Sequence, residues 1–409
     1  MDRKTIMLIA HNALPIPNVD GGAIETLITH LLNENEKQNK IRLIVTSEYD
    51  EDAAKKKYNN SKVYYYNGGF LAGISNPEIT WKIYNLSKGL LRKIFHNRIS
   101  SKFFKSEMKR MNHKTYQLYR LVKKTAPDAL VVEVLKDFTS LEHIIKKFGV
   151  DNCYLHLHGP YTKNDNVCNL FPNTISISKY VRDWWTDHCP NDKKDHVLYN
   201  CVDIDQFCND SEYDILILKK ELGINKDDLI VLFCGRLIPE KGISELLDAF
   251  DCLVPYPIVL IMIGSENFSK GNSSGFSKQI VTRAEGMENV RYLGYVPNET
   301  IAAYYAIADI QVVPSVCQEG AGIVAIEGMA SGLPLIITRS GGMTEYVDDA
   351  CAIKLPIDNY LPQNIAKSLL CLYKDESLRL KMGAKGKETA KQYSVQNYYK
   401  NFVEIFNKT

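Results

Sequence analysis

The stretch from residue 310 to residue 346 constrains the fold more than any other part of the sequence. Its apolar run Ile310–Val313 stops at Pro314, which is typical of a short buried strand. A glycine-containing loop follows, then a helical pattern at Ile323–Ala330 that ends before Gly332, and then a second apolar run. The order strand, loop, helix, strand indicates an α/β domain, in which such loops face the ligand.

Two carboxylates bracket this loop, because Glu319 and Glu327 lie eight positions apart. The glycines of the loop allow a ligand to approach the backbone, and the N–H groups at the start of the helix suit a phosphate. A carboxylate two turns further on suits sugar hydroxyls. An ordinary βα unit with chance glutamates is the alternative interpretation. The backbone groups expected at the ligand belong to Gly320, Ala321, Gly322, Ile323 and Val324.

The E-x7-E spacing, with M-A-S-G-L-P and S-G-G-x-x-E after it, resembles the nucleotide-sugar site of glycosyltransferase family 4. The resemblance implies the GT-B fold, in which two doubly wound, Rossmann-like α/β domains face a cleft. It assigns residues 1–205 to an acceptor-binding domain and residues 206–390 to a nucleotide-sugar-binding domain. It assigns residues 391–409 to a helix that crosses back to the first domain. A chain of 409 residues also suits two domains better than one core.

Composition is typical of a soluble globular protein, with 45% hydrophobic and 24% charged residues. No apolar run approaches the ~18 residues that a membrane span needs, and residues 5–10 are too short for the apolar part of a signal peptide. The ten cysteines include no C-x-x-C pair, so the sequence indicates neither a zinc site nor a disulfide framework. We therefore expect a cytoplasmic protein whose cysteines are mostly buried thiols.

The first half of the chain begins as a doubly wound sheet does. Thr5–Ala10 and Ile41–Thr46 are expected strands on either side of a helix at Ala23–Leu32. A Gly21-Gly22 turn precedes the helix, and the family resemblance places both glycines on the diphosphate side of the cleft. The turn lacks the dinucleotide-binding fingerprint, and a plain tight turn explains the glycine pair equally well.

Two histidines come at the end of a further expected strand, Asn152–Leu157. We expect one of them to face the core and the other to face the opposite side. His158 matches the His-Gly that the family has at this point, and His156 does not. The resemblance therefore places His158 in the cleft, near the donor sugar or the acceptor. A structural role is the alternative for either histidine.

Positive charge gathers between Lys82 and Lys124. This segment holds thirteen Lys and Arg residues and one Glu, whereas the whole chain has a net charge of +2. Large apolar residues recur every fourth position from Leu91 to Phe103, which is typical of a basic amphipathic helix on an anionic membrane surface. A helix that packs on its own domain, with solvated charges, is the alternative. No aromatic platform or known module supports a nucleic-acid partner.

The second domain is expected to start with a strand at Leu229–Cys234, and the polar segment 210–228 before it is expected to carry the crossover. The strand leads into a turn that contains Gly235, Arg236 and Lys241, and two cations at the start of a helix complement a diphosphate. Two further expected strands lead into turns that we include in the substrate site. Those turns contain Gly264, Ser265, Tyr295 and Val296, and the resemblance assigns a contact with the nucleotide base to the Tyr295-Val296 backbone.

The resemblance implies a retaining hexosyltransferase that moves a sugar from a nucleotide-sugar, with a UDP-sugar favoured, to a glycan acceptor without a metal or another cofactor. Arg236 and Lys241 would stabilise the charge of the leaving diphosphate, Glu319 would orient the donor sugar, and Glu327 would hold the ribose. The basic segment motivates a lipid-linked acceptor and a role in capsule or exopolysaccharide synthesis at the inner face of the cell membrane. A nucleotide-sugar epimerase or hydrolase and a non-catalytic GT-B partner subunit are the alternatives.

Overall fold

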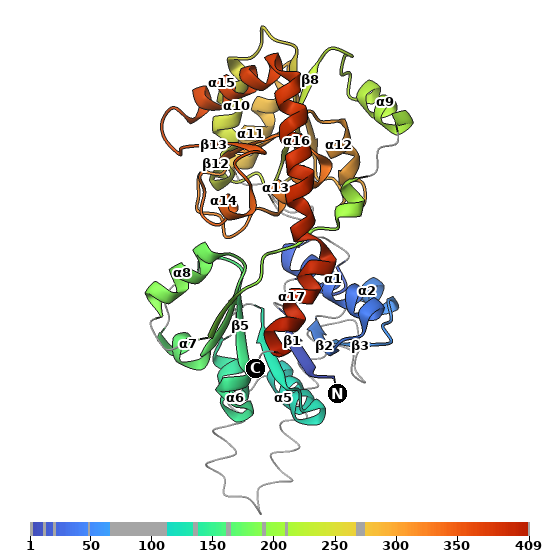
Figure 1. The fold of residues 1–409 in the computed structure, drawn as a ribbon, viewed down its shortest axis with the longest axis vertical. Coiled ribbons are helices and arrows are strands. Elements are labelled where there is room, and N and C mark those ends of the chain that lie inside the picture. Colours follow the sequence, from blue (N-terminus) through green and yellow to red (C-terminus); the bar gives the residue numbers. More distant parts are fainter. Residues whose placement is uncertain are drawn as a thin grey trace, which may run out of the picture.

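The protein forms two lobes, each built on one parallel sheet, as the computed structural model shows (Figure 1). The structure describes residues 3–10, 14–18, 22–47, 50–65, 113–133, 138–160, 165–189, 194–208, 212–266 and 275–407. Gly21 and residues 82–112 of the basic segment lie outside these ranges. We call the lobe that holds β1 to β7 lobe 1, and the lobe that holds β8 to β13 lobe 2.

The sheet of lobe 1 has the strand order β3-β2-β1-β4-β5-β6-β7, and all neighbours are parallel. Its central strands are buried apolar runs, as expected for a parallel sheet with helices on both faces. The strands are β1 (Thr5–Ile9), β2 (Arg42–Ser47), β3 (Ser61–Tyr65), β4 (Ala129–Val132), β5 (Cys153–Leu157), β6 (Asn173–Ser176) and β7 (Lys194–Val197). The helices of this lobe are α1 (Ala23–Gln38), α2 (Glu51–Lys55), α5 (His113–Thr125), α6 (Phe138–Phe148), α7 (Asp165–Leu170), α8 (Lys179–His188) and the short η1 (Val150–Asn152).

The sheet of lobe 2 has the order β10-β9-β8-β11-β12-β13 and is also parallel throughout. Its strands are β8 (Leu229–Cys234), β9 (Ile258–Ile263), β10 (Val290–Gly294), β11 (Ile310–Val313), β12 (Leu335–Thr338) and β13 (Ala352–Leu355). The longer helices are α9 (Glu212–Glu221), α10 (Ile243–Asp251), α11 (Gly275–Glu285), α12 (Ile301–Ile307), α13 (Ile323–Ser331), α15 (Leu361–Lys374) and α16 (Glu376–Ala390). Short helical segments are η2 (Ile204–Phe207), η3 (Pro239–Lys241), α14 (Met343–Tyr346) and η4 (Lys391–Tyr393). The two sheets confirm the predicted α/β class.

The last helix, α17 (Val395–Asn407), leaves lobe 2 and packs on lobe 1 beside α1 (Figure 1). Tyr399 and Phe402 are fully buried in the same core as the β1 side chains, and each buried ring stabilises this packing by about 1.5–3 kcal/mol. The Tyr399 hydroxyl donates a hydrogen bond of 2.5 Å to the Asn35 side chain on α1. The predicted C-terminal helix that crosses back is therefore confirmed.

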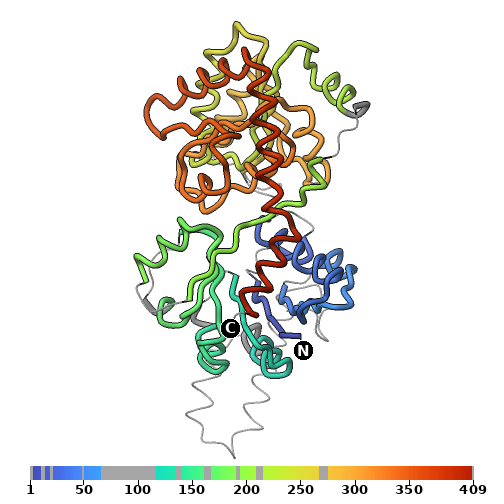
Figure 2. Tube along the Cα trace, viewed as in Figure 1, coloured from blue at the N-terminus to red at the C-terminus, as the bar shows by residue number. Residues whose placement is uncertain are grey.

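Two segments cross between the lobes next to each other, as the tube in Figure 2 shows. One follows β7 and the other joins η4 to α17. They are hydrogen-bonded, because the Val202 N–H donates to the Tyr393 carbonyl at 3.0 Å and Val202 bridges to Ser394. The segment 210–228 does not carry the crossover that we predicted. It holds α9, which packs on α12 of lobe 2, and even the preceding η2 contacts α12 and α13.

The lobes also touch where loops after β5 and β6 meet loops after β11 and β12, and we call this contact the interlobe junction. The Ser178 hydroxyl donates to the Gly320 carbonyl at 2.7 Å, and the Tyr346 hydroxyl donates to the Ile177 carbonyl. A Cβ added at Gly320 would lie 2.8 Å from the carbonyl oxygen of His158. The carboxyl ends of the two sheets are thus brought against each other.

The cysteines differ from the prediction. Cys168 and Cys189 form a disulfide in lobe 1, so these two are not thiols. Of the eight free cysteines, three are buried: Cys153, Cys201 and Cys351. The prediction of mostly buried thiols was therefore wrong. The disulfide was missed because two cysteines 21 positions apart carry no local sequence signal.

The part of the basic segment that the structure describes belongs to α5. Leu118 and Val122 on this helix are buried in the core of lobe 1, whereas Lys123 and Lys124 are exposed. This end of the segment therefore packs its apolar face on its own lobe, and the prediction for residues 82–112 is not tested. None of the described helices combines the length and apolarity that crossing a bilayer requires.

Candidate active site

The candidate site in lobe 2 lies where the sheet changes direction. From β8 the chain continues to β9 on one side, and β11 later returns on the other side, so the carboxyl ends of β8 and β11 form a switch point of the kind that binds ligands. Lys241 follows β8 and Glu319 follows β11. The Lys241 ammonium lies 2.5 Å from Oε1 of Glu319, and the Ser315 hydroxyl donates to the same oxygen at 2.6 Å. The structure thus brings two of the predicted site residues into contact across the switch point.

Arg236 is the second predicted cation, and it lies in the turn directly after β8. Its side chain is exposed, and within the ranges that the structure describes its guanidinium makes no hydrogen bond or ion pair. Lys241 and Glu319 differ from it in being largely shielded, with side-chain exposures of 23% and 16%. The site therefore combines a neutralised, shielded ion pair with a cation whose donors are available to a ligand.

The loop that carries Glu319 is held by the S-G-G motif after β12. The Gly342 N–H donates to the Glu319 carbonyl at 2.8 Å, and the Glu319 N–H donates to the Ser340 hydroxyl at 3.0 Å. A Cβ added at Gly342 would lie 2.2 Å from the Gly320 carbonyl oxygen, so this position requires glycine. The predicted backbone residues 320–324 run from this loop into α13, whose N-terminus has no side-chain cap. An anion can bind there without displacing a protein group.

Glu327 lies on α13 and does not contact the Lys241–Glu319 pair. Instead, Oε2 of Glu327 accepts a hydrogen bond of 2.6 Å from the Tyr305 hydroxyl, and Gln311 donates to that hydroxyl at 3.3 Å. Burial raises the pKa of Glu327, and the hydrogen bond from Tyr305 offsets this only in part. The carboxylate predicted to hold the ribose is therefore fixed from within lobe 2, and its role at the ribose stays a prediction.

The predicted turn residues after β8, β9 and β10 pack against one another. The Gly264 N–H donates to the Gly294 carbonyl at 2.8 Å, and a Cβ at Gly264 would lie 1.8 Å from the Gly235 carbonyl oxygen. Gly264 also has a φ of +136°, which side chains rarely adopt. Of the other turn residues, Ser265 accepts the Leu237 N–H through its carbonyl at 3.1 Å, Tyr295 is 46% exposed and Val296 is nearly buried. All of them lie at the same sheet edge as Arg236.

Lobe 1 contributes Gly22, which follows β1, and His158, which follows β5; these two strands lie on either side of β4. Gly22 starts α1 with a φ of +103°, and a Cβ there would lie 2.3 Å from the Glu25 carboxylate. This geometry requires glycine whether or not a ligand binds. His158 follows β5 and lies beside Gly320 of lobe 2, so it is the predicted lobe 1 residue that the structure brings to the Glu319 loop.

The prediction that His156 and His158 face opposite sides was wrong. Residues two positions apart in a strand lie on the same face, and both imidazoles contact Oε2 of Glu133, at 2.9 Å and 2.8 Å. Sequence reasoning missed Glu133, although an acidic residue after the apolar run of β4 was a possible signal, because buried charges require partners. Burial alone would raise the pKa of Glu133, but the two histidines lower it to about 2.

Sequence reasoning also assigned no role to Glu345, the acidic residue of the S-G-G-x-x-E motif. Its carboxylate accepts the N–H groups of Lys179 and Tyr180 at 2.8 Å and 2.6 Å, and the Tyr199 hydroxyl at 3.0 Å. Because Lys179 and Tyr180 begin α8, Glu345 of lobe 2 caps a helix of lobe 1. Glu345 is therefore an interlobe contact.

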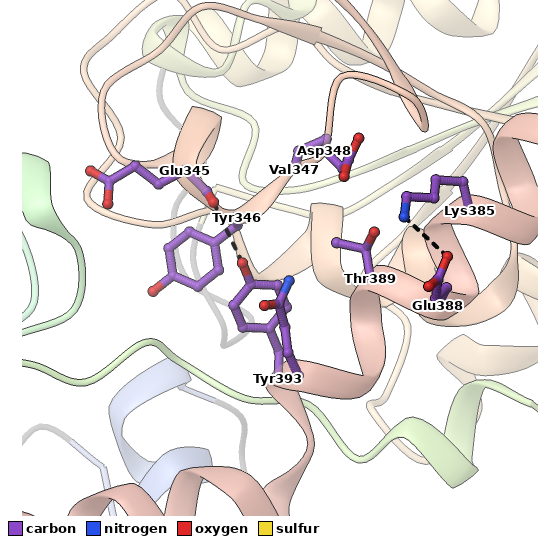
Figure 3. A pocket seen from close by; sticks show the side chains of 9 residues that line it. Glu345, Tyr346, Val347, Asp348, Lys385, Glu388, Thr389 and Tyr393 are labelled. Atoms are coloured by element: carbon purple, nitrogen blue, oxygen red, sulfur yellow. Dashed lines mark hydrogen bonds and ion pairs between the residues drawn. The ribbon is translucent and has the colours of Figure 1, made fainter.

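A cavity of about 350 Å³ lies beside Glu345, between α14 and the end of α16 (Figure 3). Two of its four charged residues, Lys385 and Glu388, pair with each other at 3.0 Å. The residues that line it are Glu345, Tyr346, Val347, Asp348, Lys385, Glu388, Thr389, Gln392 and Tyr393. None of the predicted site residues is among them, so we do not assign the donor to this cavity.

The chain is similar to known glycosyltransferases. Residues 214–389 match the family model of glycosyl transferases group 1. An uncharacterized glycosyltransferase of Methanocaldococcus jannaschii is 28% identical over 66% of this chain and 69% of its own length. A D-inositol 3-phosphate glycosyltransferase of Corynebacterium urealyticum is 29% identical over 59% of this chain, and the match spans 57% of that protein.

Solved structures resemble the whole chain. A glycosyltransferase from Rickettsia africae superposes with a TM-score of 0.76 at 15% identity, covering 100% of this chain and 99% of that one. HepE from Anabaena, solved in complex with UDP and glucose, superposes with a TM-score of 0.72 at 17% identity and covers 100% of both chains. These identities show the fold alone.

The chain has the fold of the solved GT-B glycosyltransferases, and its sequence is similar to those of glycosyltransferases. More particularly, residues 214–389, which contain both predicted cations and both predicted glutamates of lobe 2, match the model of glycosyl transferases group 1.

Proposed function

We propose that this protein is a retaining glycosyltransferase of family 4 that moves a sugar from a nucleotide-sugar, with a UDP-sugar favoured, to a glycan acceptor. The observation that carries the proposal is the contact of Lys241 with Glu319 across the switch point of lobe 2. Arg236 at the same sheet edge and the uncapped N-terminus of α13 complete a positive environment. HepE, which has the same fold, was solved with UDP and glucose.

The ion pair suggests how a donor would be received. A diphosphate carries more negative charge than one carboxylate, so it would compete with Glu319 for Lys241. Glu319 would then be released toward the hydroxyls of the donor sugar, while Lys241 would hold the diphosphate. Arg236 would stabilise the charge that grows on the leaving diphosphate. In this scheme side-chain cations supply the charge stabilisation that a divalent metal supplies in other transferases.

Retention is proposed to follow from attack on the face that the diphosphate leaves. A double displacement would need a carboxylate nucleophile near the anomeric carbon. Glu319 pairs with Lys241, and Glu327 is hydrogen-bonded to Tyr305, so neither carboxylate is assigned to that role. The acceptor would enter from lobe 1, where His158 lies beside Gly320.

The acceptor is proposed to be lipid-linked, in cell-surface polysaccharide synthesis on the inner face of the membrane. The basic segment 82–124 supports this part through its charge. Vesicle flotation tests it directly: the full chain should bind vesicles with anionic lipids at low salt and dissociate as salt screens the charge. Equal binding to neutral and anionic vesicles, or none to either, would remove the membrane from the proposal.

Thermal unfolding with a panel of nucleotide-sugars is the first test of the donor. A donor at 100 times its dissociation constant adds about 2.7 kcal/mol to the stability of the native state, so the correct nucleotide should raise the Tm and its competitors should not. Turnover is then measured with and without acceptor glycans and with and without a chelator. Product formed from donor alone would favour the epimerase or hydrolase, and donor binding without any turnover would favour the partner subunit.

Arg236→Ala tests the leaving-group role. Losing one preorganised cation should lower the transfer rate by about 10²–10³, while the exposed position predicts little change in Tm. Lys226→Ala is the matched control, because Lys226 is an exposed cation of the same lobe that precedes β8 and so lies at the opposite end of that strand. Full transfer by Arg236→Ala at saturating donor would refute the assignment.

A further inference from the structure

A buried charge cluster joins the carboxyl ends of the neighbouring strands β4 and β5 in lobe 1. Glu133 follows β4, and His156 and His158 come at the end of β5, the neighbouring parallel strand. Glu133 is 1% exposed. A single oxygen of its carboxylate, Oε2, lies 2.9 Å from Nδ1 of His156 and 2.8 Å from Nε2 of His158. The described ranges contain no other group of three acidic, His or Cys residues whose ligand atoms come this close together.

The distances decide what this cluster is. Ligand atoms that share a tetrahedral zinc ion at 2.0–2.2 Å lie roughly 3.3 Å apart. Contacts of 2.8 Å and 2.9 Å between nitrogen and oxygen are instead those of charge-assisted hydrogen bonds. Because an ionised carboxylate only accepts hydrogen bonds, Nδ1 of His156 and Nε2 of His158 both carry a proton.

The net charge follows from burial. A buried carboxylate with two neutral imidazoles would be an uncompensated charge, and two imidazolium ions would leave an excess positive charge. One carboxylate with one imidazolium is neutral. Nε2 of His156 is buried and has no hydrogen-bond partner among the described residues, so a proton there would be an unsatisfied buried donor. The His158 side chain is 14% exposed against 2% for His156, so the second proton belongs on His158.

We propose that Glu133 is a positioning residue that holds the side chain of His158 as an imidazolium ion on the lobe 1 side of the interlobe junction, where the backbone of His158 lies against Gly320. His156 is the neutral second donor that keeps the Glu133 carboxylate in place. The role given to the imidazolium in catalysis rests on the proposed function. It adds a positive charge from lobe 1 to those of Arg236 and Lys241 in lobe 2, next to the donor whose leaving group becomes negative.

Two other ionisable residues of the described ranges, Tyr398 and Glu319, bear on the charge of the cluster. Within the described ranges, Tyr398 on α17 interacts electrostatically with Glu133, and its pKa lies far above neutrality because the phenol is buried. Across the junction, Glu319 directly precedes Gly320 in the sequence, and its carboxylate is paired with Lys241. Of these groups, Glu133 is the one whose carboxylate contacts the His158 ring.

Titration of the histidine rings by NMR tests the proposal without substrate. A carboxylate at this distance raises the pKa of an imidazole by about 1–3 units, so His158 should titrate above the ordinary value near 6.5. In Glu133→Gln the His158 pKa should fall by at least one unit. Glu142→Gln, which removes an exposed carboxylate of the same lobe that pairs with Lys146, should leave it unchanged.

Kinetics then test the role in transfer. Because transfer would need the imidazolium, the alkaline limb of the kcat profile should move to lower pH in Glu133→Gln, and kcat at pH 7.5 should fall about tenfold with the KM for the donor changed less than threefold. A His158 pKa below 6.5 in the unaltered chain would overturn the proposal. So would an unchanged pH profile, or a stoichiometric metal whose chelation moves the histidine signals. If no nucleotide-sugar is turned over but His158 titrates as expected, the proposed function fails and the charge of the cluster stands.

Discussion

Replacing Gly320 with alanine tests whether transfer depends on the interlobe junction. The added Cβ would lie 2.8 Å from the His158 carbonyl oxygen and 3.1 Å from Cα of Gly159, both in the backbone of lobe 1. An ordinary contact begins at 3.4 Å, so the backbones must separate by 0.6 Å. A misplacement of about 1 Å can cost 10² in rate, and we therefore expect Gly320→Ala to lower kcat about tenfold.

The same contact offers its own control. A Cβ added at Gly159 would meet nothing within 4 Å, so Gly159→Ala should retain transfer within twofold. Donor affinity should change little in either variant if the donor is held by lobe 2, and this is measured by the rise in Tm with nucleotide. Initial rates at saturating donor and acceptor compare the two variants. If Gly320→Ala is as active as Gly159→Ala, catalysis does not require the lobes to meet as they do here, and the assignment of His158 to the site falls with it.

Three further predictions concern stability. Gly264→Ala should lose far more free energy of unfolding in urea than Gly149→Ala. Both glycines have a positive φ, which costs an alanine about 1–2 kcal/mol, but the Cβ at position 264 would also lie 1.8 Å from a backbone oxygen, whereas the Cβ at position 149 would meet nothing within 4 Å. Equal losses in the two variants would contradict the clash. Tyr305→Phe should cost about 1–3 kcal/mol, because it leaves the Glu327 carboxylate without its hydrogen bond, and unchanged urea unfolding would count against this. The pKa of Glu133 is about 2 in the folded protein against 4.5 for the unperturbed group, so the stabilisation by this carboxylate is complete above about pH 4.5 and is lost as pH falls toward 2. Glu133→Gln should therefore lose less stability than the unaltered chain in that window. Parallel curves of stability against pH for the two proteins would argue against the low pKa.

The sequence predicted those parts of the site that follow directly from strand ends. Arg236 and Glu319 come just after apolar runs bounded by glycine or proline, and parallel strands place such loops at one sheet edge. The strand Leu229–Cys234 was predicted to the residue for the same reason. Contact between Lys241 and Glu319 could be expected from their charges once β8 and β11 were neighbours.

Features that depend on which strands or lobes are neighbours were missed. Glu133 was missed because its two partners lie at the end of β5, and neither segment by itself shows that β4 pairs with β5. Glu345 caps a helix more than 160 positions earlier in the chain, a contact that exists once the lobes are assembled. For His156 and His158 the information was present, since the period of a strand places both on one face.

The two neighbouring crossings determine how the lobes can move. Lobe 2 departs from lobe 1 through Val202 and rejoins it through Ser394, and these positions are bridged to each other. Sliding the lobes apart would break that bridge and the hydrogen bond beside it, whereas swinging them about it would not. The chain thus passes between the lobes at one place, and an opening that turned about Val202 and Ser394 would keep their bridge while it separated Ser178 from Gly320.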